Sequence, residues 1–250
     1  MIDPKPGRIP VISIIRSSVA IPWRKRAAMF RALLPISLIL ITLRMIQPVI
    51  LAQMGSLAEF VILVLYVPAF TVFAVTCHRL ILLGDDSVPN YGLMKWSKRE
   101  SRFIGWSLLG YFAWFAISML VMFFSVGLTG SLQALPVTWV EYAPYCMLIP
   151  GTYLIARFSL LLPATAVDQR HDLTWAWAVT EKNGWRLVLL VGVLPIALWY
   201  GLSYLLERSV IVDFVIYAVG CVLYVVEVAA LSLSFQYLTG HSSGASDSVA

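Results

Sequence analysis

Residues 57–83 read LAEFVILVLYVPAFTVFAVTCHRLILL, an almost uninterrupted apolar stretch. A helix rises about 1.5 Å per residue, and crossing a hydrocarbon core of about 30 Å takes about 20 apolar residues. This stretch is therefore long enough to span a membrane. With it, other apolar stretches of similar length predict six spans, which lie near residues 33–51, 57–83, 103–128, 139–163, 185–206 and 211–238.

The composition of the whole chain supports the same class. Of its 250 residues, 60% are hydrophobic and 12% are charged, whereas soluble proteins have about 45–50% and about 25%. The mean hydropathy is +0.84. These values exclude an ordinary soluble domain and argue against disorder and nucleic-acid binding. We therefore predict an all-α fold, a polytopic bundle of six transmembrane helices.

Motifs of catalysis and metal binding are missing from the sequence. Cys77, Cys146 and Cys221 lie inside apolar stretches without metal or disulfide spacing, so we expect free thiols. The nucleophile-elbow, zinc-protease, Walker and dinucleotide patterns are also not found. His171 and Asp172 are adjacent in a polar segment, but Asp172 is better explained as the cap of a helix over 174–182. We predict no catalytic residue, no metal and no cofactor.

The basic residues indicate the orientation, because Lys and Arg in short connections stay on the cytoplasmic side. They gather before the first span, after the second and after the fourth, whereas the segments after the first, third and fifth spans hold only Arg208. Both termini are therefore expected in the cytoplasm. The chain divides into a cytoplasmic segment over 1–31, a transmembrane domain over 32–239 and a polar, flexible tail over 240–250.

Each cytoplasmic segment that leads into an odd-numbered span shows the same order: a Trp, basic or polar residues, an aromatic next to Arg, and then the span. This order suggests three related units and helices that lie in the cytoplasmic interface. In the first segment, Ile12, Ile15, Val19 and Trp23 recur at helical spacing, although Pro22 interrupts the pattern.

Trp and basic side chains at this depth are suited to lipid headgroups, above all anionic ones. The alternative is that the same residues only set the topology. The residues that we expect to contact headgroups are Trp23, Arg24, Lys25, Arg26, Trp96, Lys98, Arg99, Arg102, Arg157, Trp177, Lys182, Trp185 and Arg186.

Two opposite charges lie at matching depth inside the first and last spans. Arg44 follows Leu33 by 11 residues and Glu227 precedes Leu238 by 11, so both lie about 16 Å from the cytoplasmic ends. An unpaired charge at this depth is costly, so we predict an ion pair between them. The pair has either a structural role or a role in a solute pathway. Alternatively, the first span is shifted and Arg44 reaches an interface.

Residues 157–186 are similar in sequence to a segment of known membrane proteins. The stretch RFSLLLPA at 157–164, continuing through Asp168 to TEKNGWR at 180–186, resembles a pattern in six-span bacterial membrane proteins, the YciC-like group, and in the membrane domain attached to some glycerophosphodiester phosphodiesterases. The phosphodiesterase catalytic domain has no counterpart here, so its chemistry is not implied. The resemblance implies a bacterial inner-membrane location and a link to lipid metabolism or membrane organisation.

Taken together, the sequence predicts a non-enzymatic, multi-pass protein of the cell inner membrane. We expect it to bind membrane lipids or a membrane-protein partner and to act in envelope organisation or lipid handling. The alternative is a small-solute or ion transporter or channel whose pathway passes Arg44 and Glu227.

Overall fold

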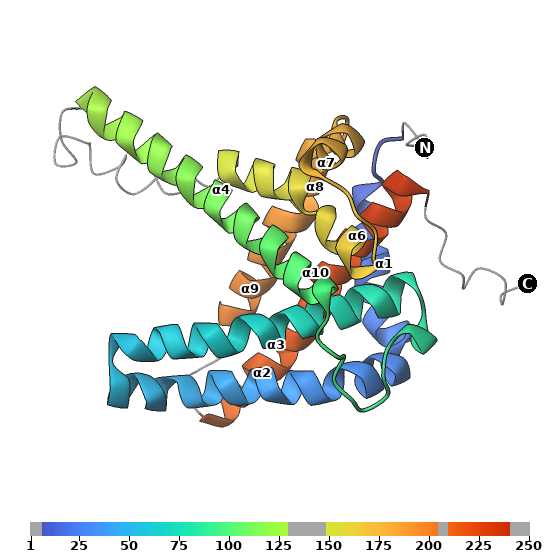
Figure 1. The fold of residues 1–250 in the computed structure, drawn as a ribbon, viewed down its shortest axis with the longest axis vertical. Helices are drawn as coiled ribbons and strands as arrows, with labels where there is room; N and C mark the ends of the chain where they lie inside the picture. The colour runs from blue at the N-terminus through green and yellow to red at the C-terminus, as the bar shows by residue number, and fades with distance from the viewer. Residues whose placement is uncertain (1–6, 130–148, 205–209, 241–250) are drawn as a thin grey trace, which may run out of the picture.

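The computed structural model describes residues 7–129, 149–204 and 210–240, and all of its regular elements in these ranges are helices (Figure 1). The helical elements that lie within the described residues follow in chain order. They are α1 (Val11–Arg24), α2 (Arg26–Met54), α3 (Ser56–Leu82), α4 (Lys98–Thr129), α6 (Leu161–Ala166), α7 (Leu173–Thr180), α8 (Gly184–Leu187), α9 (Leu194–Tyr204) and α10 (Val210–Thr239), with a 3₁₀ turn at Asp85–Ser87 and a π-helical segment at Val188–Val193 between α8 and α9.

Four helices in the described part of the chain are long and apolar enough to cross a membrane: α2, α3, α4 and α10. A fifth is counted if α7 and the helix from Gly184 to Trp199 form one bent span. α2, α3, α4 and α10 overlap the predicted spans 33–51, 57–83, 103–128 and 211–238, and the bent pair overlaps part of the predicted span 185–206. The fourth predicted span, 139–163, begins outside the described residues, and so does the predicted flexible tail beyond residue 240.

The helices meet near the end of the molecule that carries both described chain ends and diverge away from it (Figure 1). α2 and α3 form an antiparallel hairpin whose tight connection is Gly55, at a positive φ of 58° that suits glycine. α4 runs away from this hairpin, and α10 crosses behind it (Figure 1).

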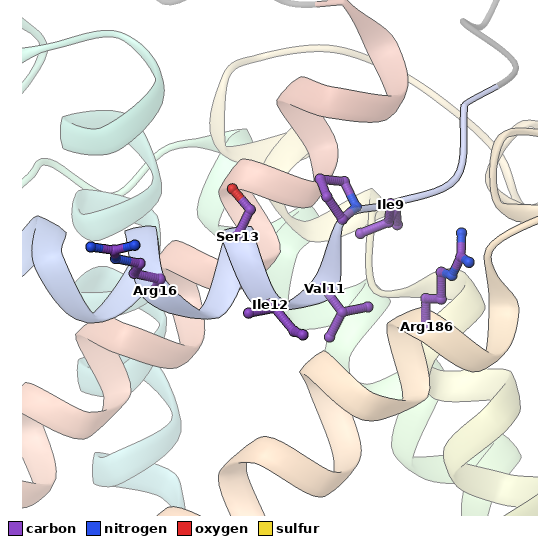
Figure 2. Close-up of a pocket in the computed structure, with 7 residues that line it drawn as sticks. Ile9, Val11, Ile12, Ser13, Arg16 and Arg186 are labelled. Atoms are coloured by element: carbon purple, nitrogen blue, oxygen red, sulfur yellow. The ribbon is translucent and has the colours of Figure 1, made fainter.

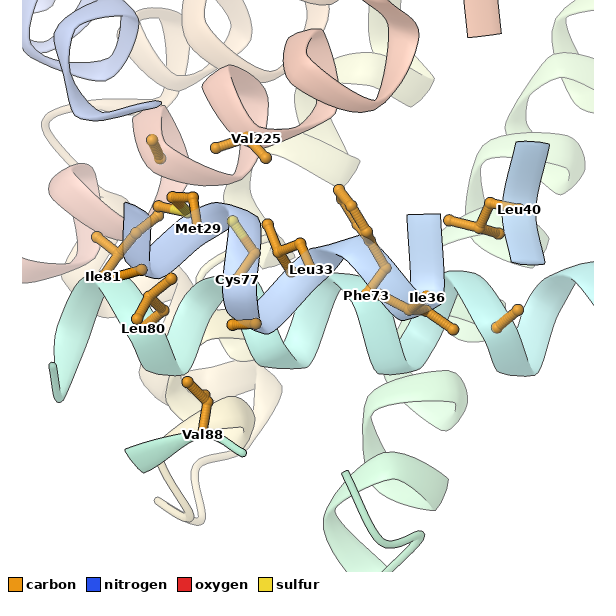
Figure 3. Close-up of a cluster of buried hydrophobic side chains, with 14 of the residues drawn as sticks. Met29, Leu33, Ile36, Leu40, Phe73, Cys77, Leu80, Ile81, Val88 and Val225 are labelled. Atoms are coloured by element: carbon orange, nitrogen blue, oxygen red, sulfur yellow. The ribbon is translucent and has the colours of Figure 1, made fainter. Parts of the chain in front are cut away.

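The larger core lies where α2, α3 and α10 cross (Figure 3). Leu33 and Ile36 of α2 pack against Phe73 and Leu80 of α3, and Val225 of α10 closes the cluster. A second core joins α1, α10 and the segment around α8 through Ile14, Leu82, Leu160, Leu187, Leu190, Phe235 and Leu238. α10 contributes to both cores and therefore holds the bundle together.

Large apolar side chains remain exposed along the spanning helices. Among the described side chains of α4, the four most exposed of these are aromatic: Tyr111, Phe112, Phe123 and Phe124. Apolar surface of this extent is unfavourable in water but natural against lipid. The exposed rings and the length of the helices both agree with a membrane protein.

The segment before α4 differs from expectation, because it has no separate interfacial helix. After the 3₁₀ turn, Pro89, Asn90 and Gly92 interrupt helical structure, and the chain stays irregular up to Ser97. The Ser97 hydroxyl and backbone amide both donate to the Glu100 carboxylate, at 2.6 and 2.8 Å. This pattern resembles a capping box, and α4 begins at the next residue, Lys98. The threefold order of the sequence is therefore not matched by three interfacial helices.

Asp172 is the N-cap of α7, as predicted: its side chain accepts a hydrogen bond of 2.8 Å from the Trp175 amide. The neighbouring His171 ring stacks on Trp175 with centroids 3.8 Å apart. Burial lowers the pKa of His171 below its ordinary value, with Asp172 opposing the shift, so the ring is neutral at pH 7. Both residues therefore contribute to the local structure at the start of α7.

Candidate functional site at the cytoplasmic end

α1 presents two different faces. Ile14 and Ser18 are buried against the body of the protein. On the other side Ile12 is 83% exposed and Trp23 is 73% exposed, and Val19 between them is also exposed. Positions 12, 19 and 23 share one helical face, so α1 has an outer apolar stripe that no described residue covers. This stripe is typical of a helix that lies in a membrane interface.

The chain leading into α1 is held by Asn183, which is 3% exposed. Its side-chain oxygen accepts from the Ile9 amide at 2.8 Å, and its side-chain nitrogen donates to the Gly7 carbonyl at 3.1 Å. The Tyr237 hydroxyl adds a bond of 3.2 Å to the Arg8 carbonyl. The start of α1 is thus fastened to the turn between α7 and α8 and to the end of α10.

A groove lies between the start of α1 and α8 (Figure 2). We call it the α1–α8 groove; it has a volume of about 620 Å³ and is lined by Ile9, Pro10, Val11, Ile12, Ser13, Arg16 and Arg186. The Nη1 atom of Arg186 is buried and has no hydrogen-bond partner among the described residues. Arg16 and Arg186 form no ion pair with a described residue.

Arg157 lies inside the protein, which corrects the expectation that it contacts headgroups: it is 3% exposed. Its Nε donates to the Thr180 hydroxyl at 2.9 Å and its Nη1 to the Tyr153 hydroxyl at 3.1 Å, while Nη2 donates to the Trp177 carbonyl. The guanidinium also lies 3.6 Å from the centroid of the Trp177 ring. Because a helix C-terminus carries partial negative charge, this cation caps the end of α7.

A second polar network ties the ends of α3 and α4 to the loop after α6. Asp168 accepts from Arg79 at 2.8 Å and from Arg99 at 3.2 Å. Arg99 also pairs with Glu100, which is fully buried, at 2.8 Å. Asp168 is half exposed, so its contribution to stability is modest. Arg79 is therefore paired with Asp168, and Arg99 is occupied by two carboxylates.

The other residues expected at headgroups divide by exposure. Three of them are partly buried: Lys25, Arg102 and Arg186. The others have exposed side chains: Trp23, Arg24, Arg26, Trp96, Lys98, Trp177, Lys182 and Trp185. Lys25 donates to the Leu80 carbonyl at 3.2 Å, and Arg102 donates to the Lys98 carbonyl within its own helix. The exposed members lie on α1 and the first residue of α2, around the start of α4, and from α7 to α8. Basic and aromatic side chains are therefore exposed at all three segments, although the Trp177 ring also contacts Arg157 and the Trp23 ring also contacts Arg26.

Arg44 and Glu227 do not form the direct ion pair that their depth predicted. Arg44 donates to Gln47 at 3.1 Å, and Glu227 accepts from the Trp199 ring nitrogen at 3.1 Å. The space between them holds aromatic rings in successive contact. Arg44 lies over Tyr66, which stacks on Phe70, which contacts Tyr224, which contacts Trp199. Side-chain spacing along each helix could not reveal these intervening rings.

His78 has the packing role expected of it. The residue is buried, its Nδ1 lies 2.7 Å from the Ser232 hydroxyl, and its ring contacts Phe103. Cys77 and Cys221 are free thiols, as expected, while Cys146 lies outside the described residues. Within the described ranges no group of His, Cys, Asp and Glu residues could hold a metal ion.

Sequence reasoning missed Asn183 and the α1–α8 groove. The signal for Asn183 was its place in TEKNGWR, between a helix end and a glycine, but its partners lie at the opposite end of the chain. No protein-family model, curated protein or solved structure matches the chain.

Proposed function

We propose that this protein is a non-enzymatic, multi-pass inner-membrane protein that binds lipid at its cytoplasmic face and acts in envelope organisation or lipid handling. The observation that carries the proposal is α1. One side of this helix packs on the bundle, and the other presents Ile12, Val19 and Trp23 beside Arg16 and Arg24. The apolar face of such a helix is favourable against lipid, and its basic side chains are favourable against phosphate.

The proposal includes six spans, both termini in the cytoplasm and three related units. The alternation of Lys and Arg between connections supports the orientation. The Trp and Arg order before α2, α4 and α8 supports the repeat, and the resemblance of residues 157–186 supports a bacterial inner membrane. Membrane lipids, above all anionic ones, are the proposed partners, and a membrane-protein partner is a further possibility of the same surface.

Reporter fusions test the topology. We expect green fluorescent protein fused after Ala250 to fluoresce, because the tail stays in the cytoplasm. Alkaline phosphatase should be active when fused after Thr129 and inactive when fused after Asp86 or Asp168, since it folds only outside the cytoplasm. The contrast between the two positions should be at least about tenfold in activity per fusion protein. Active phosphatase at Asp168 would overturn the six-span order.

Lipid selectivity tests the function. The protein is placed in nanodiscs with equimolar phosphatidylcholine and phosphatidylglycerol, released in the gas phase, and its retained lipids are identified by native mass spectrometry. We expect phosphatidylglycerol to exceed its input share several-fold, because the exposed cations at the cytoplasmic end attract anionic headgroups. Retained lipids in the input ratio would contradict specific lipid binding and leave the basic residues with a role in topology alone.

The alternative is a transporter or channel past Arg44 and Glu227. Transport normally needs several polar groups that converge on one path. Between these two charges the described side chains are aromatic rings in contact with one another. This arrangement favours a structural role for the two charges, and we therefore place lipid binding first.

A further inference from the structure

The α1–α8 groove combines an unsatisfied cation with an open volume. Arg186 has a guanidinium nitrogen that is buried and has no partner among the described residues, and a buried donor without an acceptor is unfavourable. In Figure 2 its guanidinium points toward the chain that enters α1, beside Ile9. An anion in the groove would supply the missing acceptor.

Three further features of the groove favour a negative charge. Arg16 lines it and forms no ion pair with a described residue. None of the lining residues is acidic. α1 begins at the groove without a side-chain cap and without an acidic residue in its first turn, so its first amides carry partial positive charge toward the same space.

The remaining walls are apolar and fit a lipid better than a free anion. Val11 and Ile12 point toward the helix that runs from α8 into α9, whereas Ser13 points to the other side of α1 (Figure 2). Ile12 continues into the exposed apolar stripe of α1, and Trp185 beside Arg186 is 63% exposed. A ligand with a phosphate and an acyl chain would therefore place each part against matching chemistry.

We propose that the α1–α8 groove is a specific binding site for one anionic phospholipid. The phosphate is held by Arg186, with Arg16 and the first amides of α1 adding positive charge, and the acyl chain follows Val11 and Ile12. The site rests on the proposed lipid-binding function and makes it specific: one groove, and not the basic surface in general, selects the lipid.

The test measures phosphatidylglycerol retention by native mass spectrometry after transfer from mixed nanodiscs, for wild type and variants. Arg186→Gln removes the charge at the groove, and we expect affinity to fall at least about tenfold because a charge-assisted contact to phosphate is lost. Arg170→Gln is the control, since Arg170 is exposed and does not line the groove. It should retain the wild-type preference.

A second pair of variants covers the case in which Arg186→Gln does not fold. Arg16→Gln removes an exposed charge from the wall of the groove, whereas Lys95→Gln removes an exposed charge from the loop before α4, outside the groove. We expect Arg16→Gln to weaken retention about threefold and Lys95→Gln to leave it unchanged. Equal losses of phosphatidylglycerol retention in the groove variants and in their controls would contradict the proposed site, because any surface cation would then contribute equally to lipid binding.

The outcomes separate this site from the broader function. If wild-type protein shows no preference for phosphatidylglycerol, the proposed function fails together with the site. If the preference persists unchanged in both Arg186→Gln and Arg16→Gln, lipid binding stands and the groove is excluded. Excess inorganic phosphate should not displace the lipid; displacement would show that the groove takes a free anion, and the phospholipid assignment would be overturned.

Discussion

Replacing Arg157 with Ala should lower the free energy of unfolding by about 3 kcal/mol or more, one of the largest effects expected of a single change in this protein. Arg157 donates to Thr180, Tyr153 and the Trp177 carbonyl, and it is 3% exposed. A hydrogen bond from a charged donor contributes about 1.5–3 kcal/mol, and part of the sum is offset because the removed charge no longer has to be buried.

Two variants distinguish the hydrogen bonds of the Arg157 guanidinium from the effect of its charge alone. Arg157→Lys keeps the charge but cannot reach three acceptors in one plane, so we expect it to recover less than half of the lost stability. Arg170→Gln removes an exposed Arg from the neighbouring loop and should change stability by no more than about 0.5 kcal/mol. Denaturant unfolding in one detergent measures all three. An unchanged midpoint for Arg157→Ala would show that the contacts at the end of α7 contribute nothing.

The long helices were predictable from sequence because their signal is local. An apolar stretch of membrane length already determines that α2, α3, α4 and α10 are helical and roughly where they end. The Asp172 cap was predictable for the same reason, since it binds an amide three residues away. In both cases the partners lie within one or two helical turns.

The contacts of Arg157 and Asn183 join residues that are far apart in sequence, and they were missed. Arg157 carries a charge near a predicted span end, which favoured the interpretation that it extends to headgroups. Two of its three acceptors, the Trp177 carbonyl and the Thr180 hydroxyl, lie on α7, 20 and 23 residues later. Similarly, Arg44 and Glu227 were predicted to pair because they lie at the same depth in their spans. The depth of a residue gives no information on the aromatic rings that link the two side chains.

Asn183→Ala should release the start of α1 and speed amide exchange at Ile9 by about 30-fold or more. Asn183 makes a bond with the Ile9 amide and another with the Gly7 carbonyl. Each contributes about 1 kcal/mol, so losing both costs about 2 kcal/mol, and any buried group left unpaired adds to this loss. A loss of about 2 kcal/mol corresponds to about 30-fold in a local opening equilibrium.

Hydrogen–deuterium exchange of peptides that cover residues 7–14 measures this opening. Asn90→Ala is the control, because Asn90 is exposed in the loop before α4 and the same change there leaves the start of α1 intact. Exchange in α10 should stay at the wild-type rate, which distinguishes local release from general unfolding. Unchanged exchange at Ile9 in a folded Asn183→Ala protein would show that another contact holds the segment. Since Ile9 and Pro10 line the α1–α8 groove, the released protein should also retain less phosphatidylglycerol although Arg16 and Arg186 are both present.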